Sequence, residues 1–334
     1  MSQPHTSYTA DPQRYQGRDY RRAGRSGLLL PALSLGLWHN FGDDTPLARQ
    51  RDILRTAFDH GITHFDLANN YGVPYGSAES NLGRLLRQDF GAHRDELIIS
   101  TKAGWDMWPG PYGQGGSSRK YLIASLDHSL ARLSLDYVDV FYSHRFDPDT
   151  PLEETAEALA CVVRQGKALY IGISSYSAEQ ADKIAALLNA RQVPLVLQQP
   201  LYNLLDRSIE TNGVLQGAQD RGAGVISFSP LAQGLLSGKY ALGIPADSRI
   251  GKGSHYLPEQ VLNDSLHARI QSFENVAARR GQTLSQLALS WTLRDPRITS
   301  VLVGVSTPEQ LMENLQALTN LEFTAEELEQ LADT

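Results

Sequence analysis

Eight short apolar segments rich in β-forming residues recur along this chain of 334 residues, and helix-like amphipathic segments lie between them. The predicted strands cover residues 32–38, 64–68, 96–102, 137–144, 168–174, 195–199, 224–230 and 300–305. Their starting points are 32, 32, 41, 31, 27, 29 and 76 residues apart, so a single βα unit repeats. Eight such units without a linker predict an α/β fold in which parallel strands close into a (β/α)8 TIM barrel.

Capping residues mark the beginnings of several predicted helices. Thr45 and the proline after it are expected as the N-cap and first residue of one helix, which Gly61 closes. Ser177 and Gln180 have the spacing of a capping box, and Thr307 precedes a proline in the same way near the C-terminus. These signals place helices directly after predicted strands, as the repeat requires.

An open, doubly wound sheet is the main alternative fold. Such a sheet is expected to carry a G-x-G-x-x-G turn after its first strand. Residues 33–40 read LSLGLWHN and contain no such turn, while the Gly222-x-Gly224 pair lies before a strand rather than after one. No phosphate-binding P-loop pattern occurs either. The sequence therefore favours the barrel.

Composition argues against several classes of protein. The net charge is −7 and the pI about 5.7, and the positive charge is scattered, which is untypical of a nucleic-acid or anionic-membrane surface. Cys161 is the single cysteine, so no internal disulfide forms, and no long apolar run or signal peptide is present. We expect a cytoplasmic protein with a flexible leader over residues 1–17 and one barrel domain over residues 18–334.

Polar side chains stand at the ends of three neighbouring predicted strands. Asp66 ends the second strand, with Tyr71 five residues beyond it, while Lys102 ends the third strand and His144 the fourth. In parallel barrels the C-terminal strand ends meet around one mouth, where the chemistry of such enzymes collects. We therefore expect these four side chains to lie together.

The four residue types make chemical sense as one group. A free tyrosine has a pKa of about 10 and donates its proton poorly at neutral pH, but a nearby ammonium lowers that pKa. A carboxylate keeps the lysine charged, and a histidine can hydrogen-bond a substrate oxygen. The set predicts a proton donor for an oxygen that becomes negative when hydride adds to a carbonyl. Taken singly, Asp66 could instead cap a helix, Tyr71 could line a rim and His144 could be a core residue.

Motifs on nearly every predicted strand resemble the aldo-keto reductases. The segments, which run from about residue 18 to the end, are FDLANNYG, STKAG, YSHR, GISSYS, QQPLYNLLDR, FSPLAQGLLSGKY and VLVGVSTPEQLMENLQAL. The likeness is greatest to the branch that contains potassium-channel β-subunits and bacterial L-glyceraldehyde 3-phosphate reductases. The LGLWHNFG opening and the WDMWPGPYG insertion are similar to the bacterial members.

The resemblance implies that Tyr71 is the proton donor, supported by Asp66, Lys102 and His144. It also implies a nicotinamide dinucleotide, NADP(H), bound across the barrel mouth, with a cofactor flap after strand seven at residues 231–258. The residues expected to bind the cofactor are Trp38, Asp66, Ser174, Ser175, Gln199, Phe228, Ser229, Pro230, Leu231, Gln233, Gly234, Lys239, Arg249, Gly304, Ser306, Gln310, Glu313 and Asn314. Ser175 departs from the asparagine that many members carry. Lys239 and Arg249 favour NADPH, because two cations suit an additional phosphate, although NADH stays an alternative.

The insertion at residues 105–120 is expected to overhang the mouth and to contact the substrate. Apolar walls and a positive charge would suit a small aldehyde that carries a phosphate, so we expect L-glyceraldehyde 3-phosphate, methylglyoxal or both as substrates. A simpler interpretation of the positively charged side chains in this region is that they are solvent-exposed residues at the rim. The predicted substrate residues are Trp38, Trp105, Trp108 and Arg145.

Two other functions stay open at this stage. A regulatory subunit of the channel β-subunit type would bind cofactor with little turnover, but those subunits carry asparagine at the position of His144. A metal-dependent hydrolase would need clustered histidines and carboxylates, whereas the nine histidines are dispersed, so no metal is expected. We expect no nucleic-acid or membrane partner, and relatives imply a homo-oligomer, a tetramer or larger.

Overall fold

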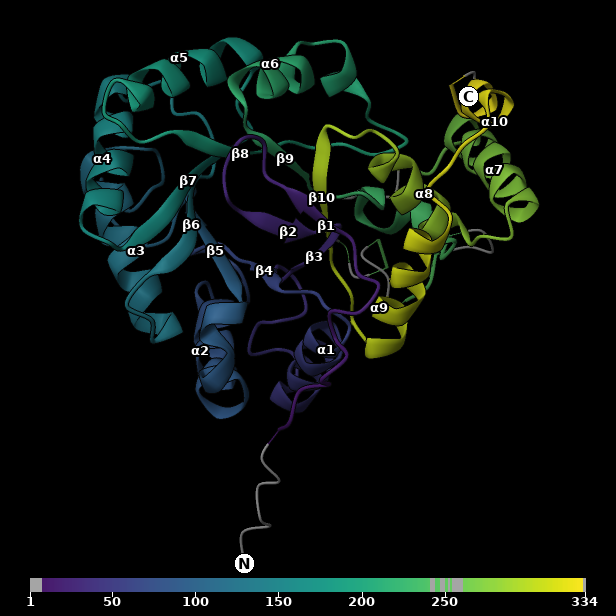
Figure 1. Cartoon of the computed structure of the whole chain (residues 1–334), viewed down its shortest axis with the longest axis horizontal. Coiled ribbons are helices and arrows are strands. Elements are labelled where there is room, and N and C mark those ends of the chain that lie inside the picture. The colour runs from purple at the N-terminus through teal and green to yellow at the C-terminus, as the bar shows by residue number, and fades with distance from the viewer. Residues whose placement is uncertain (1–7, 241–243, 247–249, 252, 254–260, 333–334) are drawn as a thin grey trace, which may run out of the picture.

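A closed barrel of eight parallel strands forms the centre of the molecule, in the order β10-β3-β4-β5-β6-β7-β8-β9 (Figure 1). The computed structural model describes residues 8–240, 244–246, 250, 251, 253 and 261–332. This architecture confirms the predicted (β/α)8 barrel. The barrel strands are β3 (Leu33–Gly36), β4 (His64–Asp66), β5 (Ile98–Ala103), β6 (Val138–Ser143), β7 (Ala168–Ser174), β8 (Leu195–Gln199), β9 (Gly224–Ser227) and β10 (Ile298–Val303).

Helices surround the barrel in chain order. The long spacing before the last strand contains the short helix η4 (Ala232–Ser237) and two full helices, α7 and α8. None of the helices in the described part of the chain is long and apolar enough to cross a membrane. The helices are α1 (Leu47–Asp59), α2 (Ser77–Leu85), α3 (Arg119–Leu133), α4 (Leu152–Arg164), α5 (Ala178–Asn189), α6 (Val214–Arg221), α7 (Asp264–Arg279), α8 (Leu284–Leu293), α9 (Pro308–Leu315) and α10 (Ala325–Ala332).

Two of the three predicted helix starts are confirmed. Ser177 and Gln180 form a capping box at α5, and the side chain of Thr307 caps α9 with proline at the first helical position. The prediction that Thr45 caps the first helix was wrong. The N-cap of α1 is Pro46, which has an extended backbone (φ −54°, ψ 130°), so helical geometry begins one residue later than predicted.

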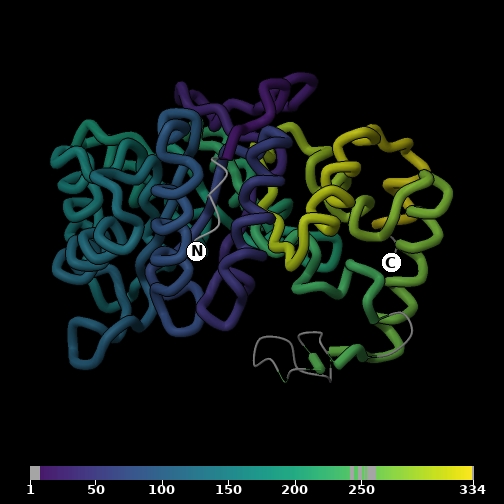
Figure 2. Tube along the Cα trace, turned by 90° about the horizontal axis from the view of Figure 1, so that it is seen from below, coloured from purple at the N-terminus to yellow at the C-terminus, as the bar shows by residue number. Residues whose placement is uncertain are grey.

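A short antiparallel hairpin, which we did not predict, lies across one end of the barrel. Its strands are β1 (Tyr20–Arg22) and β2 (Leu29–Pro31). Leu28 and Leu30 are buried against residues of the barrel interior. Figure 2 shows the hairpin at one end of the molecule and the green segment after β9 at the other. Because the hairpin closes the N-terminal end of the strands, the opposite end is the open mouth.

The segment ahead of the hairpin is attached to the barrel from Tyr8 onward. The Tyr8 hydroxyl donates to Asp59 of α1 at 2.6 Å, and Arg14 pairs with Glu96 at 2.5 Å. Residues 1–7 of the predicted leader lie outside the described residues. Within 8–17, tyrosine and arginine side chains contact the barrel, and the flexible leader stays a prediction.

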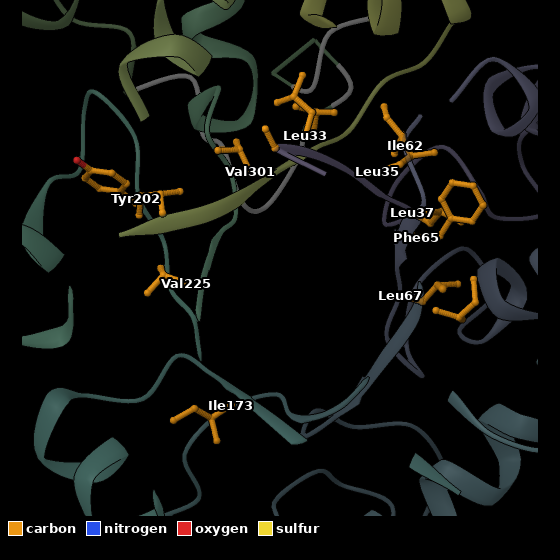
Figure 3. Packing of buried hydrophobic residues seen from close by; sticks show 14 of the residues in the cluster. Leu33, Leu35, Leu37, Ile62, Phe65, Leu67, Ile173, Tyr202, Val225 and Val301 are labelled. Carbon is orange, nitrogen blue, oxygen red and sulfur yellow. The ribbon is translucent and has the colours of Figure 1, made fainter. Parts of the chain in front are cut away.

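Side chains alternate between the two faces of each barrel strand. The outward residues Leu35, Phe65 and Val301 lie outside the ring of strands, in the layer packed against the helices (Figure 3). The inward residues fill the barrel itself, where a second apolar cluster includes Val140 and Ile226. The alternation therefore places the predicted polar side chains inside the barrel, near its mouth.

Candidate active site

Lys102 is held inside the mouth of the barrel by three oxygen atoms. Its ammonium pairs with the Asp66 carboxylate, donates to the Leu67 carbonyl at 2.7 Å and lies 3.4 Å from the Tyr71 hydroxyl. β4 and β5 are paired neighbours, so the barrel register brings Asp66 and Lys102 together. Both side chains are buried. Because a buried lysine needs a partner, the strands fix both the charge and its position.

Tyr71 reaches this ammonium from the loop after β4. The loop turns at Gly72, whose φ is +85°, and a Cβ there would meet the Ser77 hydroxyl at 2.3 Å. The Tyr71 ring stacks on Trp38 with centroids 5.8 Å apart and meets the edge of His144 at 5.9 Å. The structure therefore brings together all four residues that we predicted as catalytic.

The burial of this group sets its protonation. Burial by itself would lower the pKa of Lys102, but Asp66 and Tyr71 outweigh it, so that pKa is raised and the lysine is charged. Burial raises the pKa of the Tyr71 phenol, although part of that side chain is exposed, and Lys102 lowers it only in part. The expectation that the ammonium leaves the phenol with a pKa below its ordinary value was wrong for this state, because desolvation of the phenolate outweighs the attraction.

His144 is neutral in this environment. Burial, followed by the charges of Lys102 and Arg145, holds the pKa of His144 well below its ordinary value. Its Nδ1 atom is buried without a hydrogen-bond partner in the described structure. A neutral imidazole can donate one hydrogen bond and accept another, so His144 can contact a polar ligand beside Tyr71.

A cavity of about 570 Å³ adjoins this group through Trp38, which lines the cavity and stacks on Tyr71. Loops after β3, β8 and β9 and the helix α7 contribute its walls. Its volume and mixed lining are typical of a site for a small molecule or cofactor. Lining residues include Trp38, Leu201, Asn203, Asp206, Phe228, Ser229, Gln233 and Arg269.

The backbone around this cavity is unusual for non-glycine residues. Ser229, Ala232 and Gln233 have φ values of 53°, 45° and 60°, and Ser175 after β7 has 57°. Left-handed backbone costs free energy at such residues and gathers at functional sites. Successive right- and left-handed residues also direct backbone N–H groups into a concave surface that suits anions. These loops fit a phosphate-bearing cofactor.

The residues predicted for the nicotinamide end lie at adjacent strand ends. The buried Ser174 hydroxyl donates to the Gln199 carbonyl at 2.8 Å, and the Gln199 amide lies 3.4 Å from Asp66. The Ser175 amide donates to the same Gln199 carbonyl at 3.4 Å. Phe228 lines the cavity beyond them. The structure therefore brings this part of the predicted set next to Asp66.

The predicted pyrophosphate residues follow β9. Pro230 is buried, Leu231 is partly buried, and Gly234 takes a φ of +103° in η4. Lys239 is exposed to solvent in the turn after η4. Arg249 lies outside the described residues, so its predicted place on the flap has no structural counterpart here.

The residues predicted for the adenosine end surround the start of α9. Gly304 is exposed, while the Ser306 amide and hydroxyl both donate to the Gln310 side chain, at 2.9 and 3.0 Å. Glu313 is exposed and Asn314 is buried. In this structure the Gln310 side chain therefore accepts the hydrogen bonds of both Ser306 donors at the start of this helix.

The insertion before α3 places its two tryptophans differently. Trp105 meets the edge of His144 at 6.3 Å, and the Arg145 guanidinium lies 4.8 Å above its ring. Trp108 instead packs on Tyr121 and on a histidine of α3, 5.2 and 5.5 Å away. Trp105, Arg145 and Trp38 therefore border the mouth, whereas Trp108 supports the insertion from the side of α3.

Sequence reasoning missed several residues of the cavity, among them the polar residues Asn203, Asp206 and Arg269. Asn203 and Asp206 follow the end of β8, and the strand-end rule that found Lys102 could have indicated them. Arg269 comes from α7, more than 35 residues after β9, and no local signal placed it there. Within the described residues, no group of three or more histidine, cysteine or carboxylate side chains could hold a metal ion.

The mouth of this parallel barrel holds a tyrosine, a charged lysine, a carboxylate and a neutral histidine beside a cofactor-sized cavity. This arrangement is that of a carbonyl-reducing oxidoreductase. Residues 32–334 match the model of the Aldo/keto reductase family, so the chain belongs to this family of oxidoreductases, whose members generally use NAD(P)H. The match confirms the resemblance drawn from the motifs.

The chain is similar to named relatives over nearly its whole length. The chain is 60% identical over 327 residues to the L-glyceraldehyde 3-phosphate reductase of Escherichia coli O157:H7, and the aligned region covers 97% of this chain and 94% of that protein. The identity to the protein of the same name in Escherichia coli strain K12 is 59% over the same length and shares. A probable voltage-gated potassium channel subunit beta of Oryza sativa subsp. japonica is 37% identical over 306 residues, 90% of each chain.

Proposed function

We propose that this protein is an NADPH-dependent reductase of small aldehydes, with L-glyceraldehyde 3-phosphate, methylglyoxal or both as substrates, and with Tyr71 as the proton donor. The observation that carries the proposal is the buried ammonium of Lys102, fixed between the Asp66 carboxylate and the Tyr71 hydroxyl. Such an arrangement stabilises a phenolate, and a phenolate is what remains when a tyrosine gives up its proton.

The chain's own residues would share the proton chemistry. The cofactor supplies a hydride to the carbonyl carbon when it is bound. Tyr71 gives its proton to the carbonyl oxygen, and Lys102 balances the negative charge left on the phenol. Asp66 holds Lys102 charged in place, and the neutral His144 donates one hydrogen bond to the same oxygen.

The cavity beside Trp38 supports a bound dinucleotide. Phe228 offers a flat apolar face for the nicotinamide ring, and the left-handed backbone at Ser229 and Gln233 suits a pyrophosphate. The guanidinium of Arg269 adds a positive charge to the cavity wall, which favours a cofactor that carries an additional phosphate. NADPH is therefore the preferred cofactor, with NADH as the weaker one.

The mouth supports a small, phosphorylated substrate. Trp38 and Trp105 provide apolar contact on either side of the Tyr71–His144 pair. Arg145 donates to the Gly104 carbonyl at 2.8 Å, which leaves its guanidinium oriented along the Trp105 ring. The names of the 60% and 59% identical relatives add a specific candidate, L-glyceraldehyde 3-phosphate.

The first experiment follows NADPH absorbance with purified protein and each enantiomer of glyceraldehyde 3-phosphate. We expect rapid oxidation of NADPH with the L enantiomer, slower oxidation of NADH, and loss of at least about 10²-fold in kcat in Tyr71→Phe. Equal turnover with NADH would contradict the cofactor preference. Tight binding of NADPH without turnover of either enantiomer would favour the alternative, a cofactor-binding regulatory subunit of the channel β-subunit type; the 37% identical relative is named as a probable voltage-gated potassium channel subunit beta.

A further inference from the structure

A histidine that the proposed reaction does not use lies deep inside the barrel. His64 on β4 is fully buried, and both of its ring nitrogens lie 2.9 Å from serine hydroxyls. Nδ1 faces Ser34 on β3, and Nε2 faces Ser100 on β5. Asp66 follows two residues later on the same face of β4. The imidazole therefore lies directly beneath the group that holds Lys102.

These side chains form one continuous line of hydrogen bonds along the barrel. The Ser100 hydroxyl donates to Asp66 at 2.6 Å, and its oxygen meets His64. Below His64, the Ser34 and Ser300 hydroxyls are 2.6 Å apart, and Ser300 donates to the Pro31 carbonyl at 2.7 Å. The line thus runs from the carboxylate at the mouth to the hairpin that closes the other end.

A count of protons shows that this line cannot be complete. It contains five hydrogen bonds between two ends that only accept, a carboxylate and a carbonyl. Three hydroxyls and one neutral imidazole supply four protons, one fewer than the bonds. One bond therefore lacks its proton, and the position of the ring proton of His64 decides which end is affected.

The two neutral forms of His64 have opposite consequences. With the proton on Nε2, His64 donates to Ser100, and Ser100 is free to donate to Asp66. With the proton on Nδ1, the donation runs through Ser34 toward the Pro31 carbonyl, and Asp66 and Nε2 then compete for the single Ser100 hydrogen, so that one of these two bonds is lost. Burial lowers the pKa of His64 to about 4, so the neutral forms are the relevant ones.

The carboxylate end is the stronger acceptor. A hydrogen bond to an ionised group is about twice as strong as one between neutral groups, and the bond from Ser100 to Asp66 is short, 2.6 Å. The acceptor at the hairpin end is the neutral Pro31 carbonyl, so a missing proton costs less there than at the carboxylate. The balance favours the form that serves Asp66.

We propose that His64 is a positioning residue that carries its ring proton on Nε2 and thereby keeps the Ser100 hydroxyl donated to Asp66. This role rests on the proposed function, because the carboxylate so held is the one that fixes Lys102 against Tyr71. Without the Ser100 hydrogen, Asp66 presents more negative charge to its surroundings. Asp66 already raises the pKa of Tyr71, so the phenol should then hold its proton more tightly.

Few groups in the described structure act on the pKa values of Tyr71 and His64. Tyr71 faces Lys102, Asp66 and the neutral His144. The charges that act on His64 are those of Asp66 and Lys102, which oppose each other. A change confined to Ser100 therefore reaches Tyr71 through Asp66 and Lys102.

The position of the ring proton can be measured without any turnover. Protein labelled with ¹⁵N-histidine gives separate signals for Nδ1 and Nε2, and comparison with His64→Gln identifies those of His64. At pH 7 we expect a neutral ring with the proton on Nε2. A proton on Nδ1, or a doubly protonated ring, would overturn the proposal. Because neither aldehyde nor cofactor is present, this result stands whether or not the proposed function holds.

Two serine variants test whether the hydrogen bond from Ser100 to Asp66 affects the pKa of Tyr71. Both serine hydroxyls lie 2.9 Å from the His64 ring. In Ser100→Ala we expect the basic limb of the pH profile of kcat/KM to move upward by about half a unit to one unit. Ser34→Ala removes a buried hydroxyl on the other side of the imidazole and should leave that limb in place. Equal shifts in the two variants, or none in Ser100→Ala, would overturn the positioning role. If the wild type lacks turnover, ultraviolet titration of the phenol, with Tyr71→Phe in each background as the blank, gives the same comparison.

Discussion

The two halves of the barrel interior differ in chemistry although they share one outer layer. The buried polar side chains of the interior gather on β3, β4, β5 and β10, and they are Ser34, His64, Asp66, Ser100, Lys102 and Ser300. Leu302 of β10 belongs to the interior apolar cluster. Inward positions of β6, β8 and β9 are largely apolar, and they include Val140, Tyr142, Leu197 and Ile226. On the outside, all eight strands present apolar residues to the helices.

The difference shows how one fold separates stability from chemistry. The outer layer and the apolar half of the interior stabilise the barrel by removing apolar surface from water. The polar half pairs its groups with one another through a connected network, and the loss of one member lowers stability by leaving its partners buried and unpaired. A substitution in the polar half should therefore lower both activity and stability, whereas one in the apolar half should lower stability alone.

Lys102→Met should have the largest effect. The variant removes the charge that balances the Tyr71 phenolate, so we expect kcat for aldehyde reduction to fall by about 10³-fold. It also leaves the Asp66 carboxylate buried without its partner, which should lower the free energy of unfolding by about 3–5 kcal/mol. Stopped-flow or steady-state NADPH oxidation measures the first effect, and urea unfolding measures the second.

A double variant separates the two effects of Lys102. Adding Asp66→Asn to Lys102→Met removes the unpaired charge, so part of the lost stability should return while activity stays low. If the double variant were as unstable as the sum of the two single changes, the pair would not be coupled. Activity above about a tenth of the wild type in Lys102→Met would contradict its role.

Ile226→Ala makes the corresponding change in the apolar half. Ile226 is fully buried in the interior cluster, and truncation should lower the free energy of unfolding by about 2–5 kcal/mol through lost burial and a residual cavity. We expect kcat to stay within about two-fold, because Ile226 has an apolar side chain that supplies no group to the proton chemistry. Urea unfolding and NADPH oxidation, measured on one preparation, test whether the two halves of the interior differ in this way. A loss of kcat as large as that in Lys102→Met would contradict the difference.

The sequence predicted the strands better than it predicted the polar half. Repeated apolar segments indicated all eight barrel strands, and strand-end polarity indicated Asp66 and Lys102. The buried line through His64 was missed, because alternation shows that its members share a face but not that four strands bring them within hydrogen-bond distance. The hairpin was missed because strands of three residues carry too short a pattern. Arg269 joins the cavity through a helix packing that no local motif encodes.

The polar half should also be the acid-sensitive one. The pKa of His64 in the folded protein is about 4, below its ordinary value of 6.5, so between these values the unfolded chain binds the proton and the folded protein does not. The free energy of unfolding should therefore fall as the pH drops through this window, by about 1 kcal/mol per pH unit from this residue. Urea unfolding at pH 7, 6, 5 and 4 measures the slope.

His64→Gln is the control for this slope. The glutamine does not titrate, so the variant should be less stable at pH 7 but should lose less stability between pH 6.5 and 4. Glu96 gives an independent reference, because its partners Tyr15, His93 and Arg14 lower its pKa to about 2 despite burial. Its contribution is present above pH 4.5 and is lost as the pH falls toward 2. Identical slopes in the wild type and His64→Gln would show that His64 is not the acid-sensitive group.

Arg145→Ala should have the smallest effect, and it asks whether the polar half continues into the substrate mouth. The guanidinium lies over Trp105 and close enough to His144 to lower the pKa of that ring. If it binds the substrate phosphate, kcat/KM for L-glyceraldehyde 3-phosphate should fall about 10-fold more than that for methylglyoxal, which carries no phosphate. Arg119→Ala is the matched control, because Arg119 stands at the end of the same insertion with its guanidinium directed to Cys161 at 3.5 Å. Equal losses for the two aldehydes in Arg145→Ala would limit its role to supporting Trp105, and a selective loss in Arg119→Ala would move the phosphate site to the start of α3.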